Sequence, residues 1–259
     1  MSSISRRDFL KLGGAALLSA AFAPVVQALA EPSIQTVLYH GSPRHPKVAL
    51  TYDDDYLVNV LQKLEKTLDK NPQTHITLFP VGEALLSNQT KDPGIWKRFY
   101  DRGHEIGYHS FHHDNLALFK TEDVLRDYDQ WLDALREVLG IDPQVRFARP
   151  PFGNVSQPFL NLCKARGLVC TMWSWGWGDI SSDDSMANIV PKTKNGDIVL
   201  MHTRTVDWET SEQGMPWLTD HGISAVTLRE LYRDLQMERI DSAGCDAGTN
   251  GSLTRTCLD

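Results

Sequence analysis

Long apolar runs are missing from most of this 259-residue chain. After residue 30, no segment approaches the roughly 20 consecutive apolar residues that a membrane-spanning helix requires, which excludes such a helix there. Basic residues are also in deficit, with 26 Lys and Arg against 33 Asp and Glu and a net charge of −7. This balance argues against nucleic acid and anionic lipid as partners, because both attract basic surfaces. Internal repeats and low-complexity blocks are absent too.

Cysteine is scarce, and its spacing excludes a common kind of metal site. The four cysteines, Cys163, Cys170, Cys245 and Cys257, form no C-x-x-C pair, so a structural zinc site is not expected. Cys245 and Cys257 flank a tail rich in Gly, Thr, Asn and Ser, where a disulfide would close a loop in an oxidising compartment. For Cys163 and Cys170 two alternatives remain open, a disulfide between them or two buried free thiols.

The first 30 residues have the order of parts of an export signal. A twin arginine, Arg6 and Arg7, precedes an uncharged stretch that ends in the small-x-small pattern Ala28-Leu29-Ala30. Glycines and a proline make this stretch a poor spanning helix, which disfavours the alternative of an uncleaved membrane anchor. We therefore expect residues 1–30 to be a twin-arginine signal peptide. The protein would then use the twin-arginine export machinery and be periplasmic or secreted.

The remaining chain alternates short apolar runs with amphipathic segments. Strands are expected near residues 46–51, 75–79, 105–108, 145–148, 168–173, 198–201 and 226–228, and the clearest helices near residues 57–68, 95–100 and 124–139. This order implies an α/β domain with a parallel sheet. We expect the domain to span residues 31–240, with its last helix ending near Leu235 and a C-terminal tail at residues 241–259.

Three consecutive carboxylates, Asp53, Asp54 and Asp55, follow the apolar run Val48-Ala49-Leu50. Carboxylates about 4–6 Å apart resist joint ionisation unless a positive charge lies beside them. A divalent metal would supply that charge. The blander interpretation is a helix N-cap, since aspartates after a strand often serve as caps. Asp55 itself is expected to be a solvated or capping residue.

A histidine cluster closes another apolar run and offers partners to these carboxylates. It reads His109-Ser110-Phe111-His112-His113. One or two carboxylates with two imidazoles make the ligand set of a catalytic zinc-type site. Alone, such histidines are more often surface or core residues, but the two clusters in this order favour metal binding. His104 and His112 are expected to be structural.

Taken with three later motifs, these clusters resemble the polysaccharide deacetylase family, the NodB-homology domain of carbohydrate esterases. The resemblance covers about residues 46–237. It implies that Asp53 is the catalytic base and Asp54 a metal ligand. The family pattern H-[ST]-x-x-H implies that His109 and His113 bind the same metal.

The later motifs add the remaining candidate residues. Arg149-Pro150-Pro151-Phe152-Gly153 resembles the third motif, whose arginine orients the catalytic aspartate. Trp173 to Asp179 resembles the fourth, with Asp179 as partner of the acid histidine. Its tryptophans alternate, so at least one face is expected to be core, and Trp175 is the candidate for stacking on a sugar. Leu200-Met201-His202 resembles the fifth, with Leu200 as an apolar pocket wall and His202 as the general acid. Phe152 is expected to contact substrate through the third motif.

The resemblance implies a distorted (β/α) barrel of about seven units, whose active site gathers at the C-terminal ends of the strands. Three departures bear on the site. Asp55 stands where the family usually has glycine, and Ile180 stands where it usually has tryptophan. The fourth motif also carries Gly176 and Gly178. Asp55 could recharge the metal site, and the other two departures would reshape the sugar pocket.

The residue types also make chemical sense as a hydrolase. Water bound to a divalent metal titrates near pH ~7 rather than about 15.7. In the expected mechanism this water attacks an amide while Asp53, held ionised by Arg149, takes its proton. His202, paired with Asp179, would protonate the leaving amine. Zinc is the expected metal, although cobalt, nickel or manganese fit the same ligands.

The expected function is removal of acetyl groups from an N-acetylated polysaccharide, such as peptidoglycan, a chitin-like polymer or an exopolysaccharide. The chain is expected to act as a monomer. Two alternatives remain open. One is an O-acetyl esterase of the xylan type, which depends less on His202 because an alkoxide leaves more easily. The other is a catalytically inactive carbohydrate-binding protein on the same fold, an alternative that Asp55 and Ile180 keep open.

Overall fold

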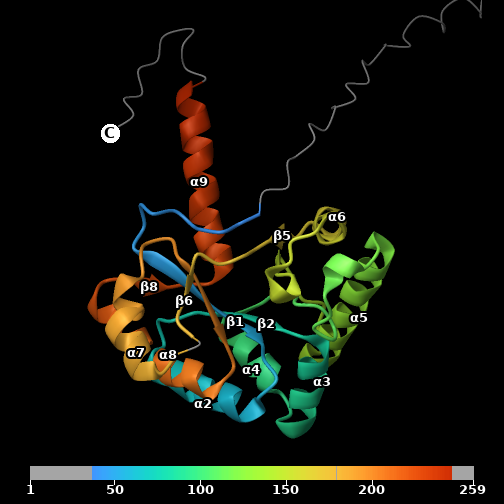
Figure 1. The fold of residues 1–259 in the computed structure, drawn as a ribbon, viewed down its shortest axis with the longest axis horizontal. Helices are drawn as coiled ribbons and strands as arrows, with labels where there is room; N and C mark the ends of the chain where they lie inside the picture. The colour runs from blue at the N-terminus through green and yellow to red at the C-terminus, as the bar shows by residue number, and fades with distance from the viewer. Residues whose placement is uncertain (1–36, 179, 247–259) are drawn as a thin grey trace, which may run out of the picture. The chain divides into compact units, whose positions relative to one another are not determined.

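The structure, a computed structural model, describes residues 37–178 and 180–246. The predicted signal peptide and the predicted disulfide partner Cys257 lie outside these residues. A parallel sheet forms the centre of the described fold (Figure 1). Its strands are β1 (Lys47–Asp54), β2 (Thr77–Pro80), β3 (Glu105–Ile106), β4 (Phe147–Ala148), β5 (Val169–Cys170), β6 (Trp175–Gly176), β7 (Ile198–His202) and β8 (Ser224–Ala225).

Strand β1 lies in the middle of the sheet. It belongs to a six-stranded sheet in the order β3-β2-β1-β7-β6, with β8 pairing to the start of β1. The side chains from Val48 to Asp53 are all buried. Burial on both faces explains why this segment reads as a continuous apolar run rather than as an alternating pattern.

The sheet curls toward closure through β4, β5 and the segment that precedes β1. Strands β4 and β5 pair in parallel. Isolated bridges join the remaining edges: Tyr108 to Ala148, Leu38 to Thr171, and His40 to Asp197. The short, irregular pairing is that of a distorted (β/α) barrel, which confirms the predicted fold class.

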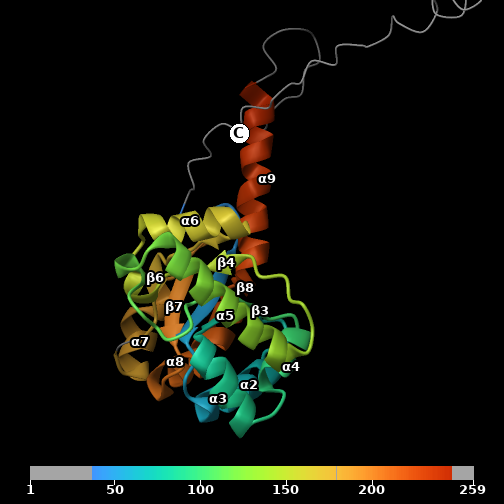
Figure 2. The ribbon, with the colours of Figure 1, turned by 90° about the vertical axis from the view of Figure 1, so that its right-hand side faces the viewer.

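Helices cover the outside of this barrel (Figures 1 and 2). They are α2 (Val58–Lys70), α3 (Gly82–Lys91), α4 (Ile95–Asp101), α5 (Thr121–Leu139), α6 (Gln157–Arg166), α7 (Ser182–Asn188), α8 (Thr205–Asp220) and α9 (Leu228–Asp246). Helix α2 packs against α8, α8 against α7, α3 against α5, and α5 against α6. None of the described helices is both long enough and apolar enough to cross a membrane.

Two predicted helices follow directly from apolar spacing. In α2, Leu61, Leu64 and Leu68 are buried on one face. Helix α5 ends at Gly140, which adopts a left-handed conformation with φ 69°, a conformation that glycine adopts without steric penalty. The periodicity therefore predicted both the buried face and the helix end.

The C-terminal helix differs from the prediction. Helix α9 does not end near Leu235 but continues to Asp246, into the segment expected to be a tail. Gln236, Met237, Glu238 and Arg239 follow Leu235 and favour helix, so no local signal ends it there. Helix α8 was not predicted, because Gly214 and Pro216 interrupt its pattern.

Cys163 and Cys170 lie in α6 and β5 and are both fully buried free thiols. They belong to the main hydrophobic core, together with the indoles of Trp96, Trp131 and Trp177. The alternative of buried free thiols is confirmed for this pair.

Candidate active site

The site begins at the C-terminal end of β1. Asp53 lies in register between Phe79 of β2 and His202 of β7. Asp54, the last residue of the strand, has φ 71°, in the left-handed region that few residues other than glycine occupy. The strand thus ends in a sharp turn that directs two successive carboxylates into the same region.

Asp54, His109 and His113 converge on one point. Oδ1 of Asp54 lies 3.4 Å from Nε2 of His109 and 3.2 Å from Nε2 of His113. One ligand atom from each residue lies within 4.8 Å of the others. The structure therefore brings together the three predicted metal ligands.

Hydrogen bonding fixes which nitrogen of His109 faces the cluster. Nδ1 of His109 lies 2.8 Å from the carbonyl oxygen of Arg149. A carbonyl only accepts, so Nδ1 carries the hydrogen and Nε2 presents a lone pair toward Asp54. A carbonyl that fixes the ligand tautomer in this way is typical of metal-binding histidines.

Electrostatics at the cluster also fit a cation. Oδ1 of Asp54 is buried yet accepts no hydrogen bond. Burial alone would raise the pKa of Asp54, but contacts with the two imidazoles outweigh it and hold that pKa far below its ordinary value. The contact with Asp54 raises the pKa of His113, against the opposing effect of burial. An unpartnered carboxylate oxygen facing two imidazole nitrogens is a donor set that suits a divalent metal such as zinc.

Arg149 connects the metal cluster to Asp53. Its side chain is fully buried, and Nη1 donates to Oδ1 of Asp53 at 2.6 Å and to Oγ1 of Thr51 at 2.8 Å. The guanidinium also donates to the carbonyls of Thr171 and Met172. Since its own carbonyl binds His109, Arg149 fixes the predicted base and a predicted ligand together.

Asp53 lies close to the cluster without joining it. Its Oδ2 is 3.8 Å from Nε2 of His109, and its side chain is 5% exposed. One oxygen is thus bound to Arg149 while the other faces the cluster. This is the arrangement expected of a base beside a metal-ligand set.

The acid-side residues lie on neighbouring strands. His202 ends β7, directly beside Asp53, and is half-buried. Leu200 lies two residues earlier, opposite Thr51, and is also half-buried. Asp179, the predicted acidic partner of His202, lies outside the described residues.

Two predicted substrate-binding residues differ in exposure. Phe152 is 62% exposed, and its ring centroid lies 4.5 Å from that of His113. Its φ of 60° is unusual for an aromatic residue. Trp175 is half-buried, and its indole N–H donates to the carbonyl of Ile189. Phe152 therefore presents the larger free surface beside the cluster, and Ile180 is also exposed.

Asp55 contradicts its prediction as a solvated or capping residue. It is fully buried, and neither carboxylate oxygen has a hydrogen-bond partner. Its φ is 61°, its N–H donates to the carbonyl of Asp53, and its own carbonyl accepts from Asn88. The turn thereby draws the side chain inward. Burial, followed by the charges of Asp53 and Asp54, raises the pKa of Asp55 well above its ordinary value.

Two further polar residues support the site and were not singled out from the sequence. Thr51 donates to the carbonyl of Val199 and accepts from Arg149. Asp127 of α5 accepts from the hydroxyl of Tyr108 and from the N–H of Phe111, on either side of His109. Asp127 follows Val124 by three residues and so falls on the apolar face of its helix, which was a readable signal.

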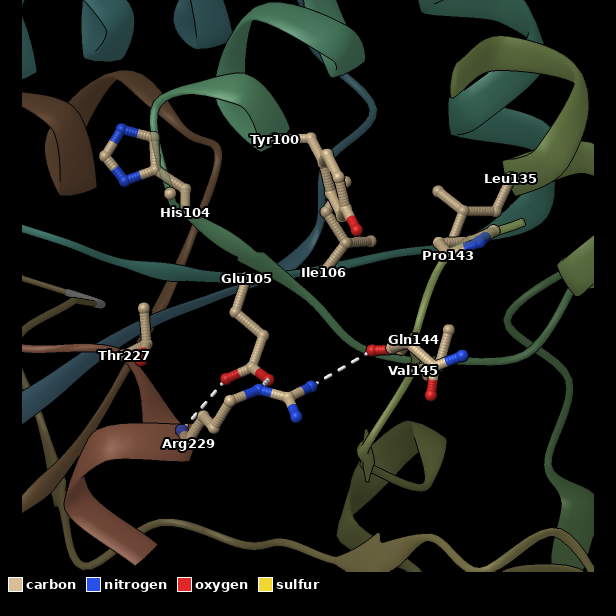
Figure 3. Close-up of a pocket in the computed structure, with 11 residues that line it drawn as sticks. Tyr100, His104, Glu105, Ile106, Leu135, Pro143, Gln144, Val145, Thr227 and Arg229 are labelled. Atoms are coloured by element: carbon tan, nitrogen blue, oxygen red, sulfur yellow. Dashed lines mark hydrogen bonds and ion pairs between the residues drawn. The ribbon is translucent and has the colours of Figure 1, made fainter. Parts of the chain in front are cut away.

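A second histidine and carboxylate pair lies at the opposite end of the sheet. His104 directly precedes β3 and Glu105 begins it, and both residues line a cavity of about 350 Å³ (Figure 3). Glu105 accepts from the backbone and guanidinium of Arg229, at the start of α9. His104 is 5% exposed, its Nδ1 accepts from the N–H of Ile76, and burial lowers its pKa to about 4. Its expected structural role is consistent with these contacts, as is the pairing of exposed His112 with Glu83.

Comparison with known proteins agrees with this geometry. The polysaccharide deacetylase family profile matches residues 40–171, half of the chain. A peptidoglycan-N-acetylglucosamine deacetylase of Bacillus cereus is 28% identical over 207 residues, which cover 75% of this chain and 71% of that protein.

Solved structures share the fold. The Bc1960 peptidoglycan N-acetylglucosamine deacetylase is 26% identical with a TM-score of 0.66, covering 75% of this chain and 92% of that one. A family 4 carbohydrate esterase pseudoenzyme from Bacillus anthracis is 21% identical with a TM-score of 0.69, covering 77% of this chain and 70% of that one. The fold is thus shared by a protein named as an enzyme and by one named as a pseudoenzyme, so activity has to be argued from the site.

Proposed function

Because the chain belongs to the polysaccharide deacetylase family, hydrolases of carbon–nitrogen bonds, we propose that it is an active, metal-dependent enzyme that removes acetyl groups from an N-acetylated polysaccharide. The observation that carries this proposal is the convergence of Asp54, His109 and His113 next to a base that Arg149 holds. An inactive binding protein would have no need of a buried arginine committed to a carboxylate at a ligand cluster.

In this proposal Asp54, His109 and His113 hold a divalent metal, zinc by preference. When bound, the metal lowers the pKa of water and stabilises negative charge on the acetyl oxygen. The residues that would hold it offer one carboxylate oxygen of Asp54 and the Nε2 atoms of both histidines.

Asp53 accepts the proton of the attacking water through the oxygen that faces the cluster. Its other oxygen accepts from Nη1 of Arg149, and this charge-assisted bond fixes the orientation of the carboxylate. A positioned base of this kind contributes roughly 10²–10⁴-fold to the rate.

His202 donates a proton to the leaving amine. Parallel strand pairing places it directly beside Asp53, so acid and base are about one strand spacing apart, roughly 4.8 Å between backbones. Asp179 is proposed as the acidic partner of His202. Phe152, Leu200 and Trp175 are proposed to line the sugar site, with a backbone N–H near Phe152 assisting the oxyanion.

Peptidoglycan is proposed as the first substrate to test, because similar proteins are named peptidoglycan deacetylases. Chitin-like polymers and exopolysaccharides present the same acetamide and remain within the proposal. The twin-arginine signal proposed for residues 1–30 would bring the enzyme to such polymers outside the cytoplasm, and the chain is proposed to work as a monomer.

Acetate release from peptidoglycan, chitin oligomers and acetylxylan tests this function directly. Zinc-loaded protein is expected to release acetate from an N-acetylated polymer and to lose that activity when the metal is chelated. Release from acetylxylan alone would replace the proposal with an O-acetyl esterase. Release from none of the three by metal-loaded protein would overturn it in favour of a binding protein.

A further inference from the structure

The loop from Tyr108 to His113 carries two of the three proposed metal ligands in a conformation that is unfavourable on its own. Ser110 has φ 69° and His113 has φ 61°, although neither is glycine. Each such residue costs about 1–2 kcal/mol relative to an ordinary backbone conformation. Contacts from outside the loop must therefore hold it in place.

Helix α3 supplies one set of these contacts. The N–H groups of Gly82 and Glu83, at its first turn, donate to the carbonyls of Ser110 and Phe111 at 3.1 Å each. Within the loop, Oγ of Ser110 accepts from the N–H of His113 at 2.9 Å. These bonds satisfy the carbonyls of Ser110 and Phe111 and leave the N–H of Phe111 to be satisfied from elsewhere.

Helix α5, which packs beside α3 (Figures 1 and 2), supplies that partner. Oδ1 of Asp127 accepts from the N–H of Phe111 at 2.9 Å and from the hydroxyl of Tyr108 at 2.5 Å. Asp127 is 9% exposed and lies among Val124, Tyr128 and Trp131 on the buried face of α5. A carboxylate is costly in such surroundings unless it is hydrogen-bonded, and both bonds go to the ligand loop.

We propose that Asp127 is a positioning residue for metal binding, which holds His109 and His113 in ligand geometry by anchoring the loop on both sides of His109. This inference rests on the metal site of the proposed function. Asp127 touches neither metal nor substrate in this role. It acts through Phe111, two residues from each ligand histidine, and through Tyr108, next to His109.

Zinc affinity of the metal-stripped full-length protein, measured by competition with a chromogenic chelator, tests the proposal. Asp127→Ala is expected to weaken zinc binding about 10–100-fold, the range typical of groups that orient metal ligands. Asp127→Asn is expected to restore affinity to within a few-fold, because its amide oxygen can still accept from both the N–H of Phe111 and the hydroxyl of Tyr108. Asp133→Ala is the matched control, because Asp133 is exposed on the same helix.

A merely structural role would lower the stability of metal-free and zinc-bound protein equally and leave zinc affinity unchanged. The proposal instead expects a larger loss of stability in the zinc-bound state. Asp127→Leu, of similar shape and suited to the apolar face, provides a second variant should Asp127→Ala not fold.

Wild-type zinc affinity in folded Asp127→Ala or folded Asp127→Leu would overturn the inference and leave the proposed function intact. Failure of the wild-type protein to bind zinc would instead overturn the proposed function itself.

Discussion

The two ends of the sheet carry similar residues with different surroundings. At the C-terminal end, His109 and Asp54 face each other, and Oδ1 of Asp54 is left without a hydrogen-bond donor. At the N-terminal end, His104 and Glu105 are adjacent in sequence, yet in Figure 3 their side chains point to opposite sides of β3. Glu105 is neutralised by Arg229.

This difference distinguishes the candidate active site from a structural cluster of the same residue types. At the N-terminal end, Glu105 accepts from Arg229 and Nδ1 of His104 accepts from the N–H of Ile76, so these atoms already have partners within the protein. At the C-terminal end, Arg149 donates to one oxygen of Asp53. The ligand atoms of Asp54, His109 and His113 converge on one point, and Oδ1 of Asp54 accepts no hydrogen bond there. The site is therefore recognised by converging ligand atoms that include an oxygen without a hydrogen-bond partner, and not by the presence of histidine and carboxylate alone.

Asp53→Asn is expected to have the largest effect and to separate the two ends most sharply. It should lower kcat about 10²–10⁴-fold, because the amide cannot accept the proton of water. Zinc content should stay unchanged, since Asp53 is not among the three converging ligands. Steady-state kinetics with metal analysis checks both, and Glu105→Gln serves as a carboxylate-to-amide control at the other end. Equal losses of activity in both variants would remove the proposed distinction.

His104→Asn is expected to alter the response of stability to acid. Burial lowers the pKa of His104 from 6.5 to about 4. Between these values the unfolded chain binds a proton that the folded chain does not, so stability falls as the pH is lowered through this window. Asparagine keeps an acceptor for the N–H of Ile76 and does not titrate.

The variant should therefore gain about 2–3 kcal/mol relative to wild type between pH 7 and pH 4. Urea unfolding at several pH values measures this difference. Parallel curves for the two proteins would show that His104 is not the buried neutral imidazole described here.

Asp55→Gly is expected to stabilise the metal-free protein by about 1–2 kcal/mol at pH 7, because it removes a buried carboxylate without partners. Glycine also suits the φ of 61° at this position. Since the folded-state pKa of Asp55 is raised, its destabilising effect grows as the pH rises above the ordinary aspartate value, and the gain should shrink near pH 4.

Thermal unfolding of the metal-free forms at pH 4 and pH 7 measures the gain. Asp55→Asn keeps the side-chain volume without the charge and should show part of the gain in stability predicted for Asp55→Gly. Loss of stability in both variants would mean that Asp55 has a partner in the folded protein.

Glu105→Gln is expected to have the smallest effect. It weakens the bonds to Arg229 at the start of α9 and should lower the free energy of unfolding by about 1 kcal/mol without changing kcat. A double-mutant cycle with Arg229→Gln measures the coupling. A fall in kcat in zinc-loaded Glu105→Gln would show that the two ends of the sheet are not independent.

Much of the site could be predicted because its residues lie at strand ends. Asp53, Asp54, His109 and His113 follow apolar runs, and parallel pairing brings such positions to one edge. The burial of Asp55 could not be predicted, because it depends on a left-handed turn that residue type alone does not specify. The hydrogen bond from His109 to the backbone carbonyl of Arg149 could not be predicted either, because every residue has such a carbonyl.

The fold showed the same limits. Helix α5 was clear from the spacing of its apolar residues and from Gly140, whereas α8 was hidden by Gly214 and Pro216. The length of α9 depended on the lack of a helix-ending residue after Leu235. Local pattern thus predicted elements that bury a regular face and failed where tertiary contacts override propensity.

Zinc titration of the metal-stripped protein by calorimetry tests the central claim most directly. Wild type and His104→Asn should each bind one zinc ion per chain, and Asp54→Ala should lose that binding. Such a result would place the metal at Asp54, His109 and His113, and at no site that depends on His104. Equal zinc binding by wild type and Asp54→Ala, or no binding by wild type, would contradict the account.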